Sequence, residues 1–323
     1  MVFPVSGVEV SPLIPPLVAF VVSLLTSMGG VSGAFLLLPF QVSVLGFVSP
    51  AVSSTNLVYN VVAIPSGIYR YLKEGRMAWP LTWVVVVGTL PGVAIGAVLR
   101  VKYLPDPMAF KLFVGLVLLY IGYRLVYDLT GRGRRASARN KEAEKKFNER
   151  IKASRRQGES GGTARVLADS RVKTLEFSFK KISYQFYGEV FSFSTWGVFA
   201  LAFIVGIVGG TYGIGGGAII APFFVAVFAL PVYTVAGAAL AGTFLTSIFG
   251  VIFYQLVVPT FAPAGMTVAP DWLLGFLFGL GGLGGMYCGA RLQKFMPAAF
   301  IKAMLAVIIV GLALRYIIQF WLK

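Results

Sequence analysis

Eight long apolar runs dominate the chain and restrict what it can fold into. Crossing the hydrocarbon core of a bilayer takes about 20 helical residues, and six of the runs have the length of one crossing each. Charged residues make up only 12% of the sequence, too few to cover a water-soluble surface, since soluble proteins average about 25%. The sequence therefore predicts an all-α polytopic membrane protein. The single-crossing runs are residues 50–72, 79–99, 108–129, 231–257, 272–290 and 297–321, and the two longer runs are 12–48 and 194–230.

Several function classes are excluded by residues that the chain lacks. Histidine, the commonest general base and transition-metal ligand, is absent, and the single Cys288 allows no intramolecular disulfide. The sequence contains no GxxxxGK[ST] nucleotide-binding motif, and within the predicted crossings Asp and Glu occur only at the ends, as Asp128 does. Proton- and cation-coupled carriers usually bury a carboxylate. We therefore expect no enzyme activity, no catalytic residue, no metal and no cofactor, and we disfavour obligate coupling to protons or cations.

The two longest apolar runs are interrupted by glycine. The sequence "SMGGVSGAF" (27–35) breaks the first run, and "GGTYGIGGGA" (209–218) breaks the second. Each break leaves pieces of about 15–17 residues, short for full crossings of about 20. Backbone without helical hydrogen bonds is tolerated at membrane depth only where protein or a water-filled cavity satisfies it. We therefore expect each run to form a discontinuous or re-entrant helical hairpin with its glycine tip inside the membrane.

The chain also repeats itself. A shift of 183 positions over residues 19–71 gives 13 identities in 53, among them Gly30 on Gly213 and Gly33 on Gly216. A shift of 193 places the stripe Gly88, Gly92 and Gly96 on Gly281, Gly285 and Gly289. We predict two homologous halves, residues 1–129 and 194–323, each with one broken hairpin and about three full transmembrane helices. Residues 130–193 join them as a flexible linker.

The linker carries most of the positive charge. It holds 16 of the 28 Lys and Arg residues and 7 of the 12 Asp and Glu residues. Basic segments beside membrane spans are typical of cytoplasmic loops, so we favour a cytoplasmic linker over an arm that binds nucleic acid. With this placement, an inverted arrangement of the two halves puts the basic gap 70–78 inside and the uncharged gap before Asp271 outside. Arg100 and Lys102 would then lie outside, against the usual bias, so a parallel arrangement stays open.

The glycine tips and the polar residues that follow them are the candidate binding site. Helix N-termini at Gly33 and Gly216 would direct N–H groups and positive dipole ends at the membrane midplane, where an anion could bind. Hydroxyl and amide side chains near each tip could complete such a site without burying a charge. The predicted substrate-binding residues are Gly30, Ser32, Gly33, Ser54, Asn56, Asn60, Gly213, Gly215, Gly216, Gly217, Thr243 and Ser247.

Each of these features also has a purely structural interpretation. Small residues spaced by four let membrane helices pack closely, and for the stripe of Gly88, Gly92 and Gly96 we favour this packing role. The polar side chains could instead hydrogen-bond between helices, which is worth about 0.6 kcal/mol per contact on average. The residues alone leave both interpretations of the polar side chains open.

The glycine segments resemble a known family. "MGGVSGAFLLLPF" (28–40) and "GTYGIGGGAIIAPFF" (210–224), together with the duplicated architecture, resemble the sulfite exporter TauE/SafE family of bacterial membrane transporters. Gly30, Gly33 and Pro39 match the first motif, and Gly213, Gly215, Gly216, Gly217 and Pro222 match the second. The first copy has Ser32 and Ala34 where the second has Gly215 and Gly217, so we expect the two tips to contribute unequally.

The resemblance implies a multi-pass protein of the bacterial inner membrane. It further implies export of sulfite, sulfonates such as sulfoacetate, or similar small sulfur-containing oxyanions, and we expect alternating access of one half against the other. The expected partners are a small anionic substrate and the lipid bilayer, without nucleic acid, and a homodimer stays open. The alternatives are a channel-like facilitator, a carrier of another small anion, cation or neutral solute, and a receptor or embedded enzyme whose linker recruits a partner.

Overall fold

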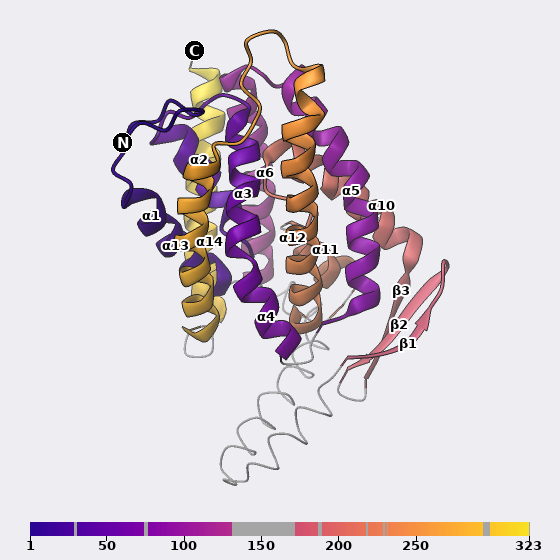
Figure 1. Cartoon of the computed structure of the whole chain (residues 1–323). Coiled ribbons are helices and arrows are strands. Elements are labelled where there is room, and N and C mark those ends of the chain that lie inside the picture. Colours follow the sequence, from indigo (N-terminus) through magenta and orange to yellow (C-terminus); the bar gives the residue numbers. More distant parts are fainter. Residues whose placement is uncertain are drawn as a thin grey trace.

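The computed structural model describes residues 1–28, 31–73, 77–130, 172–186, 189–217, 219–228, 230, 232–292 and 298–322. The first half contains α1 (Ile14–Met28), α2 (Ala34–Ser43), α3 (Ala51–Ala63), α4 (Pro65–Lys73), α5 (Trp79–Lys102) and α6 (Pro107–Leu129). Three strands follow, β1 (Lys173–Phe177), β2 (Lys181–Phe186) and β3 (Glu189–Ser194). The second half contains α10 (Thr195–Tyr212), α11 (Ile220–Val227), α12 (Val232–Leu256), η1 (Val258–Phe261), α13 (Trp272–Leu292) and α14 (Ala298–Trp321). Figure 1 shows the helices as one bundle, with the strands beside its lower end.

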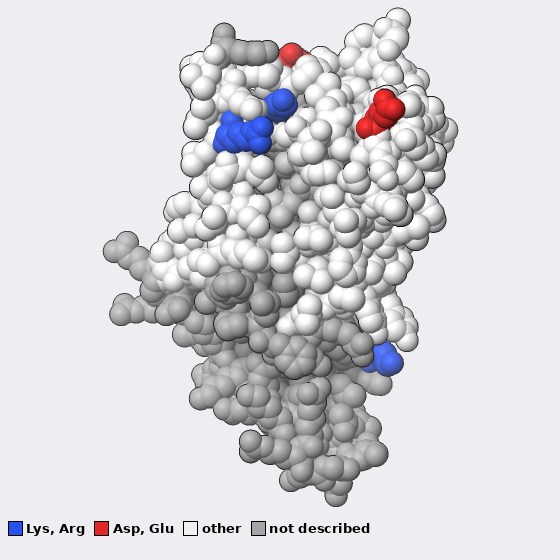
Figure 2. Space-filling model, turned by 90° about the vertical axis from the view of Figure 1, so that its left-hand side faces the viewer, with Lys and Arg blue, Asp and Glu red and all other residues white. Residues whose placement is uncertain are grey.

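Six of the described helices are long and apolar enough to cross a membrane. They lie in α5, α6, α10, α12, α13 and α14. Part of each of these spans is exposed on the outside of the bundle. On the face shown in Figure 2, the charged residues lie towards the two ends of the described surface, with an uncharged band between them. These features confirm the prediction of a polytopic membrane protein.

Two of the apolar runs fold differently from the prediction. Residues 50–72 form two helices, α3 and α4, in place of one crossing, because Pro65 lacks the N–H that would continue the helical hydrogen bonds. In the run 194–230, α10 has 18 residues and qualifies as a candidate span, while α11 has only 8. The helices α1 and α2, on either side of the first glycine break, have 15 and 10 residues.

A three-stranded antiparallel sheet is the main departure from an all-α fold. The strands pair in the order β1-β2-β3 and fall inside residues 130–194, where the sequence led us to expect a flexible linker. One face of β2 is buried through Ile182, Tyr184 and Phe186. The Tyr184 hydroxyl lies 2.8 Å from the Thr234 hydroxyl at the start of α12, and burial raises the pKa of Tyr184, which keeps this hydroxyl protonated. The sheet is therefore packed onto the second half. The rest of the expected linker, residues 131–171, lies outside the described residues.

Two glycine stripes bring pairs of helices into backbone contact. A Cβ atom added to Gly88, Gly92 or Gly96 of α5 would collide with α10, opposite Phe199, Phe203 and Ile207 respectively. A Cβ atom added to Gly281, Gly285 or Gly289 of α13 would collide with α1, opposite Pro16, Phe20 and Leu24 respectively. The packing role predicted for the stripes is confirmed. Both pairs are parallel, because residue numbers rise together along the two helices.

The two helices that precede the glycine breaks start from opposite ends of the bundle. Val101, near the end of α5, packs with Val258 and Val268 of the segment that connects α12 to α13. We call this end of the bundle the loop end, and the other, where the sheet lies, the sheet end (Figure 1). The helix α13 starts at the loop end and α5 starts at the sheet end. Because α1 is parallel to α13 and α10 is parallel to α5, α1 starts at the loop end and α10 at the sheet end.

Candidate functional site

The second glycine break forms a tight turn between α10 and α11. We call residues 213–217 the second tip, and residues 29–33, of which 31–33 are described, the first tip. Gly213 and Gly215 have φ angles of 82° and 78°, a left-handed conformation that favours glycine. Gly213 also approaches α3 so closely that an added Cβ atom would lie 2.5 Å from the Ser53 Cα atom. The glycines are therefore required both by the backbone angles and by the contact with α3.

Two asparagines of α3 hold both tips. The Asn56 amide donates to the Gly213 carbonyl at 2.9 Å and to the Ala34 carbonyl, at the start of α2, at 3.0 Å. Asn60, one turn further along α3, donates to the Ile214 carbonyl at 2.9 Å. Both side chains are fully buried. At the second tip, their donors satisfy the Gly213 and Ile214 carbonyls, which follow the end of α10 and have no helical partner. These amides therefore fix the second tip, and Asn56 also bonds to the start of α2.

The opposite wall of the second tip is formed by hydroxyls of α12. The Gly216 N–H donates to the Thr246 hydroxyl at 3.2 Å, and Thr243 donates to the Ala239 carbonyl at 2.8 Å. Ser247 is fully buried, and its hydroxyl has no hydrogen-bond partner within the described residues. A Cβ atom added to Gly215 would lie 2.8 Å from that hydroxyl. An available donor therefore lies directly against the second tip.

The first tip is filled by side chains that bond to one another. Ser32 donates to the Asn60 side-chain oxygen at 2.7 Å and accepts from the Ala34 N–H at 3.3 Å. The Tyr59 hydroxyl lies 2.7 Å from the Ser23 hydroxyl and against Gly33. Every hydroxyl named here has a protein partner.

The structure brings ten of the twelve predicted binding residues together and leaves Ser54 apart from them. Ser54 donates to the Ala51 carbonyl and, at 2.8 Å, to the Val268 carbonyl, so it bonds to the segment at the loop end. Gly30 lies outside the described residues. The residues gathered around the two tips are Ser32, Gly33, Asn56, Asn60, Gly213, Gly215, Gly216, Gly217, Thr243 and Ser247. Their side chains are neutral, so the arrangement offers hydroxyl, amide and backbone N–H groups to a ligand.

Comparison with known proteins identifies the family. Residues 16–316 match the family model described as Sulfite exporter TauE/SafE. The chain belongs to this family. The match spans both glycine tips and confirms the resemblance of the two glycine motifs. No curated protein and no solved structure matches the chain significantly.

Membership in the TauE/SafE family fixes the general class of function. The protein is a multi-pass membrane transport protein, and the family transports sulfur anions such as sulfite. The bacterial inner membrane is the typical location. Within the described part of this TauE/SafE protein, no group of three or more His, Cys, Asp or Glu side chains could hold a metal ion.

Arg100 is a buried residue that the sequence analysis treated only as a loop charge. It is fully buried near the end of α5, donates to the Leu104 carbonyl and stacks over the Phe110 ring at 3.7 Å. Its Nε and Nη2 atoms have no hydrogen-bond partner within the described residues. Close to the end of α10, the Tyr254 hydroxyl donates to the Gly210 carbonyl at 3.1 Å. The sequence contains a signal for this burial, because Arg100 continues the four-residue spacing of Gly92 and Gly96 and therefore lies on the same side of α5.

Proposed function

We propose that the protein exports small sulfur-containing oxyanions, such as sulfite and sulfoacetate, and binds them at the second tip. The observation that carries this proposal is the buried Ser247 hydroxyl, which has no partner among the described residues and lies against Gly215. A buried hydroxyl without a partner costs about 1–3 kcal/mol. An oxyanion that accepts its hydrogen bond would remove that cost while bound.

The second tip offers further stabilisation to an anion. The helix α11 begins three residues after the tip, at Ile220, so its positive dipole end lies beside residues 213–217. Thr243 and Thr246 surround the same backbone from α12. Neutral donors bind an anion without the cost of burying an ionised side chain. They also leave the site uncharged when no anion is bound, which favours release of the anion on the other side of the membrane.

The amides of α3 have a different part in this proposal. Asn56 and Asn60 already donate to carbonyls of the second tip, Asn56 also donates to Ala34 at the start of α2, and Ser32 of the first tip already donates to Asn60. We assign these three residues to positioning the tips, and Gly215, Gly216, Gly217, Thr243 and Ser247 to contact with the anion. Because Asn60 bonds to Ser32 in the first tip and to Ile214 in the second, movement of one tip is transmitted to the other.

The arrangement of the helices supports inverted repeats and alternating access. The helices before the two breaks, α1 and α10, start from opposite ends of the bundle, and each packs on a helix of the other half. Inverted repeats that meet at a site near the membrane midplane are common in secondary transporters, which rock one repeat against the other. In our proposal α1 and α2 form one re-entrant hairpin, α10 and α11 form the other, and the substrate is exposed to each side in turn.

The membrane potential is sufficient to drive export. In a cell that is negative inside, it contributes about 2.3 kcal/mol per charge per 100 mV, which corresponds to a gradient of roughly fiftyfold. Neither a nucleotide nor a buried carboxylate is then needed. We place the basic linker, and with it the sheet end, in the cytoplasm. The protein would be a transporter without enzymatic activity.

Flux measurements in proteoliposomes test this function. Sulfite, sulfoacetate, taurine, sulfate and chloride are compared at equal concentration, each with and without an opposing gradient of unlabelled substrate. We expect sulfite or sulfoacetate to be transported. We also expect its flux to increase when the same anion is present on the other side of the membrane. Flux without such stimulation would indicate a channel-like facilitator. If uptake of a solute continues after the anions are removed but stops after sodium is removed, the proposal is overturned in favour of a cation carrier.

A further inference from the structure

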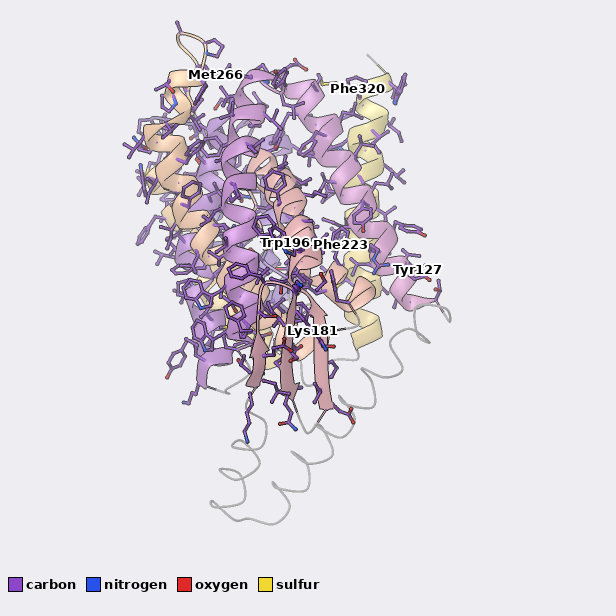
Figure 3. All side chains as sticks on the ribbon, turned by 90° about the vertical axis from the view of Figure 1, so that its right-hand side faces the viewer. Tyr127, Lys181, Trp196, Phe223, Met266 and Phe320 are labelled. Atoms are coloured by element: carbon purple, nitrogen blue, oxygen red, sulfur yellow. The ribbon has the colours of Figure 1, made fainter. Side chains whose placement is uncertain are left out.

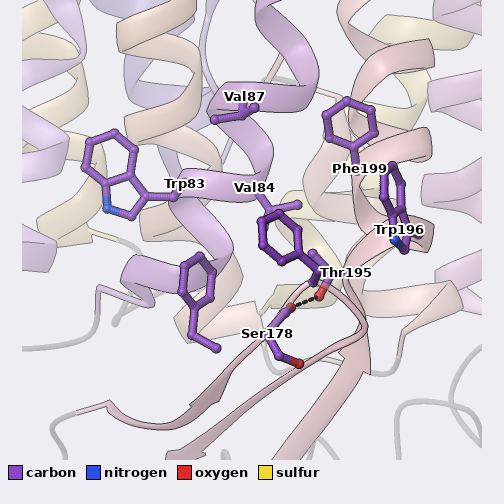
Figure 4. Close-up of a pocket in the computed structure, with 9 residues that line it drawn as sticks. Trp83, Val84, Val87, Ser178, Thr195, Trp196 and Phe199 are labelled. Carbon is purple, nitrogen blue, oxygen red and sulfur yellow. Dashed lines mark hydrogen bonds between the residues drawn. The ribbon is translucent and has the colours of Figure 1, made fainter.

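An apolar groove lies on the outside of the bundle at the sheet end. Its volume is about 420 Å³, and it is bordered by the β1–β2 turn, α5 and α10 (Figure 4). The aromatic and aliphatic side chains that line it include Trp83, Val87, Phe177, Phe179, Trp196 and Phe199. The two polar residues of the lining are already bonded to each other, since the Thr195 hydroxyl donates to the Ser178 carbonyl at 2.7 Å. The groove therefore offers almost no polar group to an occupant.

The groove opens to the bilayer. Phe179 is 85% exposed, Trp196 63% and Trp83 52%, a cluster that would be unfavourable in water. Both bordering helices are candidate membrane spans. Val87 lies about 12 Å further along α5 than Trp79, the first residue of that helix, at a rise of about 1.5 Å per residue. The groove thus extends from the membrane interface, where tryptophan is enriched, into the hydrocarbon.

A basic rim adjoins the groove. Lys180 and Lys181 directly follow Phe179 and are exposed, and Figure 3 shows Lys181 below Trp196, towards the sheet. The nearest acidic residue on the same turn, Glu176, accepts from the Ser178 hydroxyl at 3.3 Å. The turn keeps a net positive charge. An apolar slot with basic residues at its interfacial end is complementary to a lipid with an anionic headgroup.

We propose that this groove is a binding site for one anionic phospholipid, with an acyl chain along Trp83, Val87 and Trp196 and the headgroup phosphate at Lys180 and Lys181. The lipid connects the sheet to α5 and α10. The sheet is in turn attached to α12 through Tyr184 and Thr234, and Phe193 of β3 packs against Phe228 at the end of α11. Lipid occupancy therefore stabilises the sheet against the helices that carry the second tip. The site is separate from the anion site and does not depend on the proposed substrate.

Thermal unfolding in detergent, with and without added lipid, tests the proposal. The full-length protein is titrated with phosphatidylglycerol, phosphatidylcholine or glycerol 3-phosphate. Phosphatidylglycerol brominated on its acyl chains is added to a variant in which Trp79, Trp272 and Trp321 are replaced by Phe, so that quenching reports contact with Trp83 and Trp196. We expect phosphatidylglycerol to raise the melting temperature most and the brominated lipid to quench. Equal effects of phosphatidylcholine and phosphatidylglycerol would overturn the proposal, and so would an equal effect of glycerol 3-phosphate, which lacks an acyl chain.

Two variants separate the basic rim from general surface charge. In Lys180→Gln/Lys181→Gln we expect the apparent affinity for phosphatidylglycerol to fall roughly 25-fold, at about fivefold per lysine. The matched control is Lys102→Gln, which removes an exposed lysine at the loop end. This control should bind phosphatidylglycerol as the wild type does. An equal loss in both variants, or no loss in the double variant, would contradict the assignment. Because no transport is measured, the outcome is independent of the substrate of the protein.

Discussion

The two glycine tips have related sequences but different surroundings. At the first tip, Ser32 and the Tyr59 hydroxyl occupy the space beside the backbone, and each has a protein partner. At the second tip, left-handed glycines bring the backbone itself against α3 and α12, and the Ser247 hydroxyl is left without a partner among the described residues. The comparison is the basis of our proposal that the first tip is a structural support and that the second tip binds the ligand.

The largest effect is expected from a methyl group at the second tip. In Gly217→Ala the new Cβ atom would lie against the Ala239 carbonyl and 2.7 Å from the Thr243 backbone nitrogen, neither of which can rotate away. Overpacking by about 3 kcal/mol would reduce flux roughly a hundredfold. The measurement is sulfite flux in proteoliposomes at matched protein content. Gly311→Ala is the control, because nothing lies within 4 Å of the added atom, and it should transport normally. Normal flux in Gly217→Ala would contradict close packing at this tip.

Loss of the Asn56 amide, which bonds to the second tip and to the start of α2, should have a smaller effect. Asn56→Ala leaves the Ala34 and Gly213 carbonyls without their side-chain donor. We expect flux to fall about tenfold and the melting temperature to drop, at about 0.6–1.5 kcal/mol for each lost bond. Asn56→Asp keeps the shape but places a buried carboxyl group against the same carbonyl oxygens, so it should lower flux and stability at least as much. If either variant retained both wild-type flux and wild-type stability, the positioning role of Asn56 would be wrong.

The same methyl group at the first tip should be tolerated better. In Gly33→Ala the new atom would lie 2.5 Å from the Tyr59 hydroxyl, at the end of a side chain that can shift. We expect flux to fall about threefold to tenfold, at about 1 kcal/mol. Adding Tyr59→Phe removes the obstructing oxygen and should restore most of the flux. Tyr59→Phe alone is the control for loss of the contact with Ser23. A defect in Gly33→Ala as large as that in Gly217→Ala would remove the proposed difference between the tips.

The smallest effect is expected from shortening the linker. Deletion of residues 136–170 leaves both tips, β1–β3 and all described helices in the chain. If the linker only joins the two halves, flux should stay within about twofold of the wild type. A complete loss of flux with normal insertion would show that the linker does more than join the two halves.

The tips and the glycine stripes were predictable because their signals are local and repeated. Glycines that interrupt apolar runs at matched positions mark breaks, and glycines spaced by four mark close helix contacts. The direction of individual side chains was harder to predict. Ser53 and Ser54 are adjacent on α3, yet only Ser53 lies beside Gly213, while Ser54 bonds to Val268 at the loop end.

The sheet and the buried arginine were missed for physical reasons. Lysines and a glutamate between the aromatic residues of β1–β3 gave these strands the composition of a polar linker, although Tyr184 and Phe186 alternate with polar positions as half-buried strands do. Arg100 follows an apolar run, where a loop charge is the usual interpretation. Its burial depends on the packing of Phe110 in α6 and Tyr254 in α12, and neither residue belongs to its own helix, α5.

The most direct test of neutral anion binding is the dissociation constant for sulfite, measured by calorimetry on Ser247→Ala and Arg100→Gln beside the wild type. Loss of one hydrogen bond to a charged ligand is worth about 1.5 kcal/mol, so Ser247→Ala should bind about tenfold more weakly, while its melting temperature without ligand should be equal to or higher than that of the wild type. Arg100→Gln should change the dissociation constant less than threefold. Unaltered binding in Ser247→Ala together with abolished binding in Arg100→Gln would show that a buried cation holds the anion, and would contradict this account.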